Sequence, residues 1–120
     1  MTYALDPSGR WIVGTGISNP VPWYPYRGTS TDYATYDAAR ERWVDVYVDS
    51  DGNYQTSISW GPHRNTWVWR DLWLQRIPGD VASRSDQTAT VEGNVMTSEY
   101  HFKTAAGKTI EVKTICKRLP

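Results

Sequence analysis

Apolar side chains recur at every second position of this chain, in short runs separated by glycine, proline, asparagine and aspartate. A period of two is typical of half-buried β-strands, whereas an amphipathic helix needs a period of about 3.6. The runs predict eight strands, at residues 10–18, 32–37, 42–49, 53–60, 66–73, 86–92, 95–103 and 109–117. The expected fold class is all-β, an antiparallel meander that forms a small barrel or half-barrel.

Turn chemistry supports this reading between the predicted strands. Residues 49–53, 61–65 and 105–108 each contain a glycine, which adopts the positive φ that tight hairpins require. Two segments fall outside the strand pattern. Residues 19–28 hold three prolines and three aromatic residues and predict a surface loop, while residues 77–85 predict an irregular polar connection.

Length and charge limit the classes of function. The 120 residues fit one domain, 1–120, because two cores would each be too small. Thirteen basic and thirteen acidic side chains cancel, so we expect neither a nucleic-acid nor a membrane partner. No basic start followed by an apolar run marks the N-terminus, and the expected location is cytoplasmic. Cys116 is the sole cysteine, which excludes an intrachain disulfide.

The sequence contains no motif that is typical of a cofactor-binding site. Two histidines, His63 and His101, make a weak case for a metal or haem site, and no glycine-rich loop follows a strand as phosphate binding requires. Gly14 and Gly16 lie inside a predicted strand, where glycine indicates a bulge or a close approach of another group. We expect no cofactor and no metal.

Several of these segments, taken in order, resemble a bacterial family of uncharacterised lipocalin-like proteins. The likeness extends over residues 9–118, and its motifs are residues 36–44, 48–54, 59–61, 65–69 and 114–118. The resemblance implies a calycin-type β-barrel. The run that begins at Gly9 resembles the family's third strand, which implies that the first hairpin is missing. Two strand edges would then lie unpaired, and we expect a homodimer or a barrel closed by residues 19–28.

Seven tryptophans and eight tyrosines accompany a single phenylalanine. Such side chains suit the walls of a ligand pocket, although they also fill a solid core or a subunit interface. Alternation places Trp67, Trp69 and Asp71 on one face of their strand, and it places the valines of 42–49 toward the core. The candidate ligand-binding residues are Trp60, Trp67, Trp69, Tyr100, Tyr54 and Asp71.

Three functions are compatible with this pattern. The leading hypothesis is the binding of a small hydrophobic or aromatic molecule in a barrel interior lined by Trp and Tyr. A second is an isomerase- or cyclase-type enzyme, in which Asp71, Asp45 or Glu99 has a raised pKa and transfers a proton. A third is a structural or interaction module of an oligomer. The sequence leaves open whether the protein is an enzyme, and no catalytic residue is assigned.

Overall fold

Every described element of regular structure is a β-strand. The computed structural model describes residues 1–20, 22, 27–75 and 81–117, with the backbone alone at 73–75, 81–84 and 102. Its strands are β1 (Thr2–Leu5), β2 (Ile12–Ser18), β3 (Gly28–Asp37), β4 (Arg42–Asp49), β5 (Tyr54–Ser59), β6 (Pro62–His63), β7 (Thr66–Gln75), β8 (Val81–Arg84), β9 (Gln87–Glu92), β10 (Val95–Thr104) and β11 (Thr109–Lys117). The predicted all-β class is confirmed. Nowhere in the described ranges is there a helix with the length and apolar character needed to cross a bilayer.

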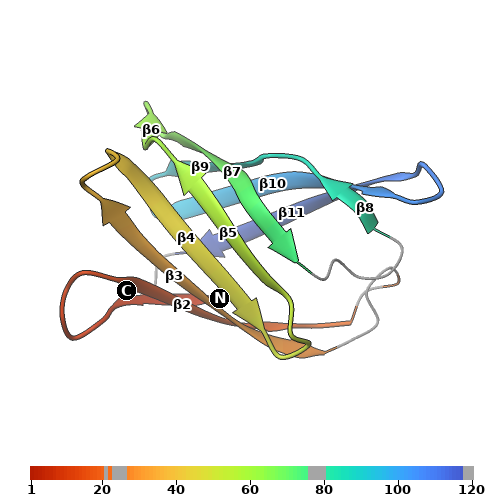
Figure 1. Cartoon of the computed structure of the whole chain (residues 1–120), viewed down its shortest axis with the longest axis horizontal. Coiled ribbons are helices and arrows are strands. Elements are labelled where there is room, and N and C mark those ends of the chain that lie inside the picture. Colours follow the sequence, from red (N-terminus) through yellow and green to blue (C-terminus); the bar gives the residue numbers. More distant parts are fainter. Residues whose placement is uncertain (21, 23–26, 76–80, 118–120) are drawn as a thin grey trace.

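The strands form one antiparallel sheet in the order β1-β2-β3-β4-β5-β7-β9-β10-β11, with β6 beside β7 and β8 beside β10. Most neighbours in the sheet are also neighbours in the sequence, so the predicted meander is confirmed. The sheet is strongly curved from β2 through β7 to β11 (Figure 1). A single curved sheet has a concave and a convex face, and alternation assigns each side chain to one of them.

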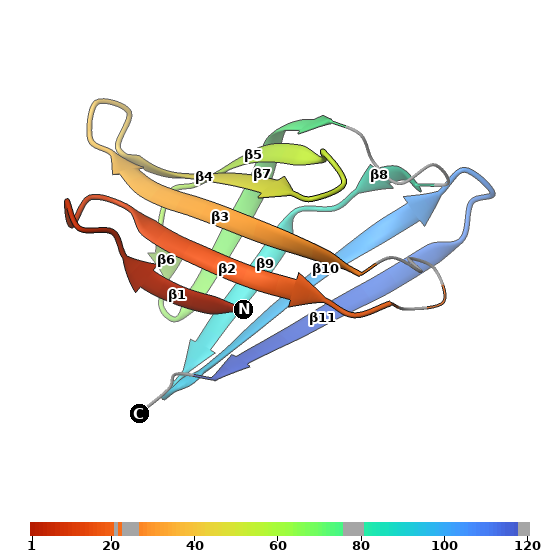
Figure 2. The same cartoon turned by 90° about the horizontal axis from the view of Figure 1, so that it is seen from below.

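The two ends of this path, β1 and β11, do not pair with each other in the described part of the chain. Figure 2 shows β10 and β11 running obliquely to β1 and β2 instead of alongside them. The twist between neighbouring strands accumulates along the path and turns the last strands away from the first. The sheet is therefore not closed into a barrel, and the closed form of the fold prediction is wrong.

The eight predicted strands correspond to β2, β3, β4, β5, β7, β9, β10 and β11, and the bounds of β4 and β11 are those predicted. Two expectations about the remaining segments are wrong. A strand, β1, precedes Gly9 and pairs with β2, so residues 10–18 do not form the first strand. Residues 81–84 of the expected polar connection form β8, which pairs with β10. Most of the aromatic part of the expected 19–28 loop, residues 23–26, lies outside the described residues.

The predicted turns have the expected chemistry. Gly52 and Gly107 adopt φ values of 80° and 81° in the turns after β4 and β10. The carboxylate of Asp49 orders the first of these turns, because it accepts hydrogen bonds from the backbone N–H of Asp51 at 3.0 Å and of Asn53 at 2.9 Å. The β4–β5 hairpin is thus fixed by an acidic side chain as well as by a glycine.

The two faces of β4 are reversed relative to the expectation that its valines point inward. The concave side carries Trp43, Asp45 and Tyr47, so the valines of β4 lie on the convex face, where Val44 and Val46 are half-buried and Val48 is 39% exposed. β-branched residues favour extended backbone even on a half-exposed face, so their alternation does not by itself identify the inside. Among the described residues, the buried hydrophobic side chains are Ile58 and Ala89. The described part of the sheet therefore does not enclose a solid apolar core.

Gly14 of β2 confirms the expectation of a close approach. The ring of Tyr3, on the neighbouring strand β1, lies across Gly14, so that a Cβ atom there would overlap the ring carbons Cε1 and Cδ1. Asp32 lies on the other side of the same glycine, 3.2 Å from that Cβ position. Glycine at position 14 lets a tyrosine and an aspartate meet over the backbone.

We predict that Gly14→Ala lowers the free energy of unfolding by about 1–3 kcal/mol, because the Tyr3 ring must move to admit the methyl group. Urea unfolding measures the change. In a Tyr3→Ala background the overlap is gone, and the same substitution should cost clearly less. Equal costs in the two backgrounds would contradict the packing described here.

Candidate functional site

A hollow of about 640 Å³ lies on the concave face of the sheet. Each strand along the path from β1 to β11 contributes to its wall, including Met1 and Tyr3 at one end and Thr114 and Cys116 at the other. Its volume falls within the range of about 300–1,000 Å³ that is usual for small-molecule sites. The curvature of the meander therefore produces a hollow of the size of a ligand site.

Three indoles form a continuous aromatic wall on this face. The rings of Trp43 and Trp67 meet edge to face, with centroids 5.5 Å apart and an angle of 80° between their planes. The rings of Trp67 and Trp69 are stacked at 5.9 Å with their planes at 11°. Both arrangements are favourable for aromatic pairs and hold the rings in place. We call Trp43, Trp67 and Trp69 the indole wall.

The hollow contains four of the six predicted site residues. Trp67, Trp69, Tyr54 and Tyr100 are among its lining residues, as the alternation of their strands predicted for the first two. Trp60 is not: it lies directly after β5, is 64% exposed and does not line the hollow. Whether the four lining residues bind a ligand stays a prediction.

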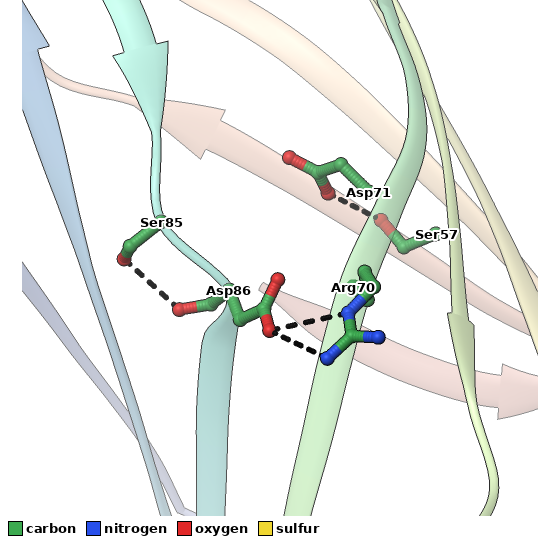
Figure 3. A network of polar contacts seen from close by, with 5 residues as sticks. All are labelled: Ser57, Arg70, Asp71, Ser85 and Asp86. Carbon is green, nitrogen blue, oxygen red and sulfur yellow. Dashed lines mark hydrogen bonds and ion pairs between the residues drawn. The ribbon is translucent and has the colours of Figure 1, made fainter.

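Asp71, the sixth predicted residue, is not among the lining residues, although its pairing with Ser57 places it on the same face of β7 as Trp69. Ser57 Oγ donates a hydrogen bond to Asp71 Oδ1 at 2.8 Å, and Gln55 Nε2 donates to Ser57 Oγ at 2.7 Å. Alternation assigns the neighbouring Arg70 to the other face of β7, and its guanidinium pairs with Asp86 at 3.4 Å (Figure 3). The strand therefore separates the Asp71 carboxylate from this ion pair.

Asp32 on β3 is a lining residue that the sequence analysis missed. Tyr3 Oη donates to Asp32 Oδ2 at the long distance of 3.5 Å, and Tyr47 is the residue paired with Asp32 on β4. Burial raises the pKa of Asp32 to about 6, against a smaller lowering by the Tyr3 hydroxyl. Burial and nearby carboxylates also raise the pKa of both tyrosines. The sequence signal that could have identified Asp32 as a lining residue was an acidic side chain at a strand position that faces inward.

The carboxylates proposed for proton transfer divide between the two faces. Asp45 lines the hollow, two residues from Trp43. Glu99 does not: it forms an ion pair with Lys113 at 2.8 Å, with both side chains well exposed. Within the described ranges, no three side chains among His, Cys, Asp and Glu come together as a metal site would require.

Comparisons with protein-family models, with curated proteins and with solved structures gave no match for this chain. The resemblance to lipocalin-like proteins therefore stays a prediction. The geometry of the hollow itself carries the functional argument.

We predict that Asp32→Asn stabilises the protein at pH 8 by about 1–3 kcal/mol. A raised carboxyl pKa means that the folded state binds the proton more tightly than the unfolded state does. The stability that this proton contributes is complete below pH 3.8 and is lost as the pH rises through about 6. Asparagine removes that loss, so the difference between variant and wild type should grow from pH 4 to pH 8 in urea unfolding.

Asp6→Asn is the matched control, and its expected effect has the opposite sign. Hydrogen bonds from Ser8 and from the backbone N–H of Trp11 lower the pKa of Asp6 to about 2, in the turn between β1 and β2. Its stabilising contribution is present above pH 3.8, so Asp6→Asn should be less stable than wild type at pH 8. A pH-independent difference for Asp32→Asn would show that the carboxyl does not titrate as described.

Proposed function

We propose that this protein binds a small aromatic or otherwise apolar molecule in the hollow of its concave face, in the manner of a lipocalin-like half-barrel. The observation that carries the proposal is the indole wall, which faces a hollow of about 640 Å³. Apolar surface gains about 25 cal/mol for each Å² removed from water, and indoles offer large flat areas to a planar ligand.

The scarcity of buried apolar residues favours this reading over a solid core. Among the described hydrophobic residues Ile58 and Ala89 alone are buried, at 3% and 4% exposure, and of these two only Ala89 lines the hollow. In a packed domain the large side chains of the inner face would be the most buried ones. Here the indole wall keeps part of its surface accessible on the inner side, where a ligand would cover it.

Trp67→Phe and Trp60→Phe form a matched pair for testing the proposal by intrinsic fluorescence. We expect at least one compound from a panel of naphthalene and indole derivatives to change the wild-type emission in a saturable way. Trp67→Phe should weaken its affinity about three- to tenfold, as expected for the loss of one aromatic contact. Trp60→Phe should leave the affinity unchanged, because Trp60 lies outside the hollow. A flat response over the whole panel, or equal effects of the two variants, would count against the proposal.

An enzymatic role is the second candidate, and the position of Asp32 favours it. A carboxyl with a pKa of about 6, beside the Tyr3 hydroxyl and facing the hollow, suits general acid–base catalysis near neutral pH. An isomerase- or cyclase-type reaction would use such a group. The test is deuterium exchange from solvent into a bound ligand, which Asp32→Asn should abolish. Exchange that continues in this variant would eliminate Asp32 as the acid–base group.

A homodimer also stays a proposal. The open path of the sheet leaves β1 and β11 as edge strands, and unpaired edges favour association with another chain. Sedimentation at micromolar concentration tests it, and a clean monomer would rule it out.

A further inference from the structure

The acidic and basic side chains of this protein are distributed unequally between the hollow and the rest of the surface. Four aspartates line the hollow, whereas its described lining residues include no lysine, arginine or histidine. The whole chain carries equal numbers of acidic and basic residues. Arg70 and Lys113 form ion pairs with Asp86 and Glu99, away from the hollow. The formally charged side chains among the described lining residues are therefore all acidic, and concave low-dielectric walls concentrate the field of such groups.

Two of the four lining aspartates belong to a turn. Asp49 accepts hydrogen bonds from the backbone of the β4–β5 turn, from Asn53 Nδ2 at 2.8 Å and from Tyr47 Oη at 3.2 Å. Asp51 lies in the same turn. The hydrogen bonds of the turn therefore account for the carboxylate of Asp49 at its position.

Asp32 and Asp45, in contrast, lie within the strands of the sheet. β3 and β4 are adjacent, and Asp45 is paired with Ala34, two residues after Asp32. The two carboxylates are therefore diagonal neighbours on the concave face, a relation with Cα atoms about 7–8 Å apart. Neither position belongs to a turn, and Asp32 accepts a hydrogen bond from Tyr3 Oη within the hollow.

Aromatic faces accompany these carboxylates. Trp43 precedes Asp45 by two residues on the same face of β4, and both side chains line the hollow. Among side chains, tryptophan attracts cations to its ring face most strongly. The hollow thus combines the two features that recognise an organic cation: aromatic faces for its body and carboxylates for its charge.

We propose that the ligand of the hollow is an organic cation, a small amine or quaternary ammonium compound with an aromatic or alkyl body. The body lies against the indole wall and the charged nitrogen lies near Asp32 and Asp45. This inference rests on the proposed binding function and specifies its ligand class. A bare metal ion fits poorly, because the described residues bring no three metal-ligating side chains together.

Three probes of the same shape and different charge test the inference: trimethyl(2-naphthyl)ammonium, neutral 2-tert-butylnaphthalene and anionic naphthalene-2-sulfonate. Their affinities are measured by fluorescence titration at low ionic strength and pH 8. The cation should bind about tenfold more tightly than the neutral probe, as one desolvated cation–π contact predicts, and the anion should bind most weakly. Neutral binding as tight as that of the cation would overturn the inference and leave the proposed function intact. If none of the three binds, both fail.

Aspartate variants then locate the charge. Asp32→Asn and Asp45→Asn should each reduce the preference for the cation over the neutral probe by about threefold or more while leaving the affinity for the neutral probe almost unchanged. Asp86→Asn is the matched control, since its carboxylate pairs with Arg70 outside the hollow. An equal reduction by Asp86→Asn would show that the preference comes from overall charge, and would overturn the assignment to Asp32 and Asp45.

Discussion

The concave face of the sheet has to be shielded from water, and the rest of this structure depends on this constraint. All described regular structure belongs to one antiparallel sheet, so no helix and no second sheet packs on the inner side. A sheet with an apolar face exposed to water is unstable, and curvature is the remaining way to shield that face. The twist that produces the curvature also keeps β1 from meeting β11. The outcome is a hollow that is partly covered by its own side chains.

Strand β5 shows how residue sizes adapt to this curvature. β5 lies between β4 and β7, and the rings of Trp43 and Trp67 meet across it. Ser59 is paired with Trp43 and is fully buried, at 0% exposure. Small hydroxyl side chains occupy the inner face of β5 because indoles from both neighbouring strands take up the space above it. The indole wall is therefore a product of three strands acting together.

Much of the fold could be predicted from the sequence, because alternation and turn chemistry are local properties. The bounds of β4, the turn at Gly52 and the common face of Trp67 and Trp69 all follow from residues close together in the chain. The inner face of β5 could not be predicted. Its serines face inward only because bulky residues of other strands cover them, which is a tertiary effect.

The candidate site was predictable to a similar extent. Trp60 lies outside the hollow because Ser57 and Ser59 face inward, so alternation directs Trp60 to the opposite face. Asp32 was missed because β3 begins earlier than predicted, at Gly28, and only the longer strand gives the aspartate a definite face. A bulge adds a further limit: the register between β5 and β7 shifts between Thr56 and Ser57 and leaves Leu72 of β7 as an extra residue. Alternation reverses at such a point, and no feature of the sequence marks it.

The aspartates illustrate how position determines the role of one residue type. Asp6 and Asp49 both accept hydrogen bonds from the backbone of turns. The pKa of Asp6 is lowered, so its carboxylate stays ionised over a wide pH range. Asp32 has the same side chain on a curved inner face, where burial raises its pKa. The turn aspartates stabilise the hairpins, whereas Asp32 brings a carboxyl group into the strand-lined part of the hollow.

The most direct test of the central claim, that ligands enter the concave face, is a ¹H–¹⁵N spectrum of the indole N–H groups during titration with trimethyl(2-naphthyl)ammonium. Single Trp→Phe variants assign the indole signals of the seven tryptophans. The account predicts shifts for Trp43, Trp67 and Trp69, and none for Trp60 or Trp11, which do not line the hollow. Shifts confined to Trp60 and Trp11 would place the ligand on the outside and contradict the account.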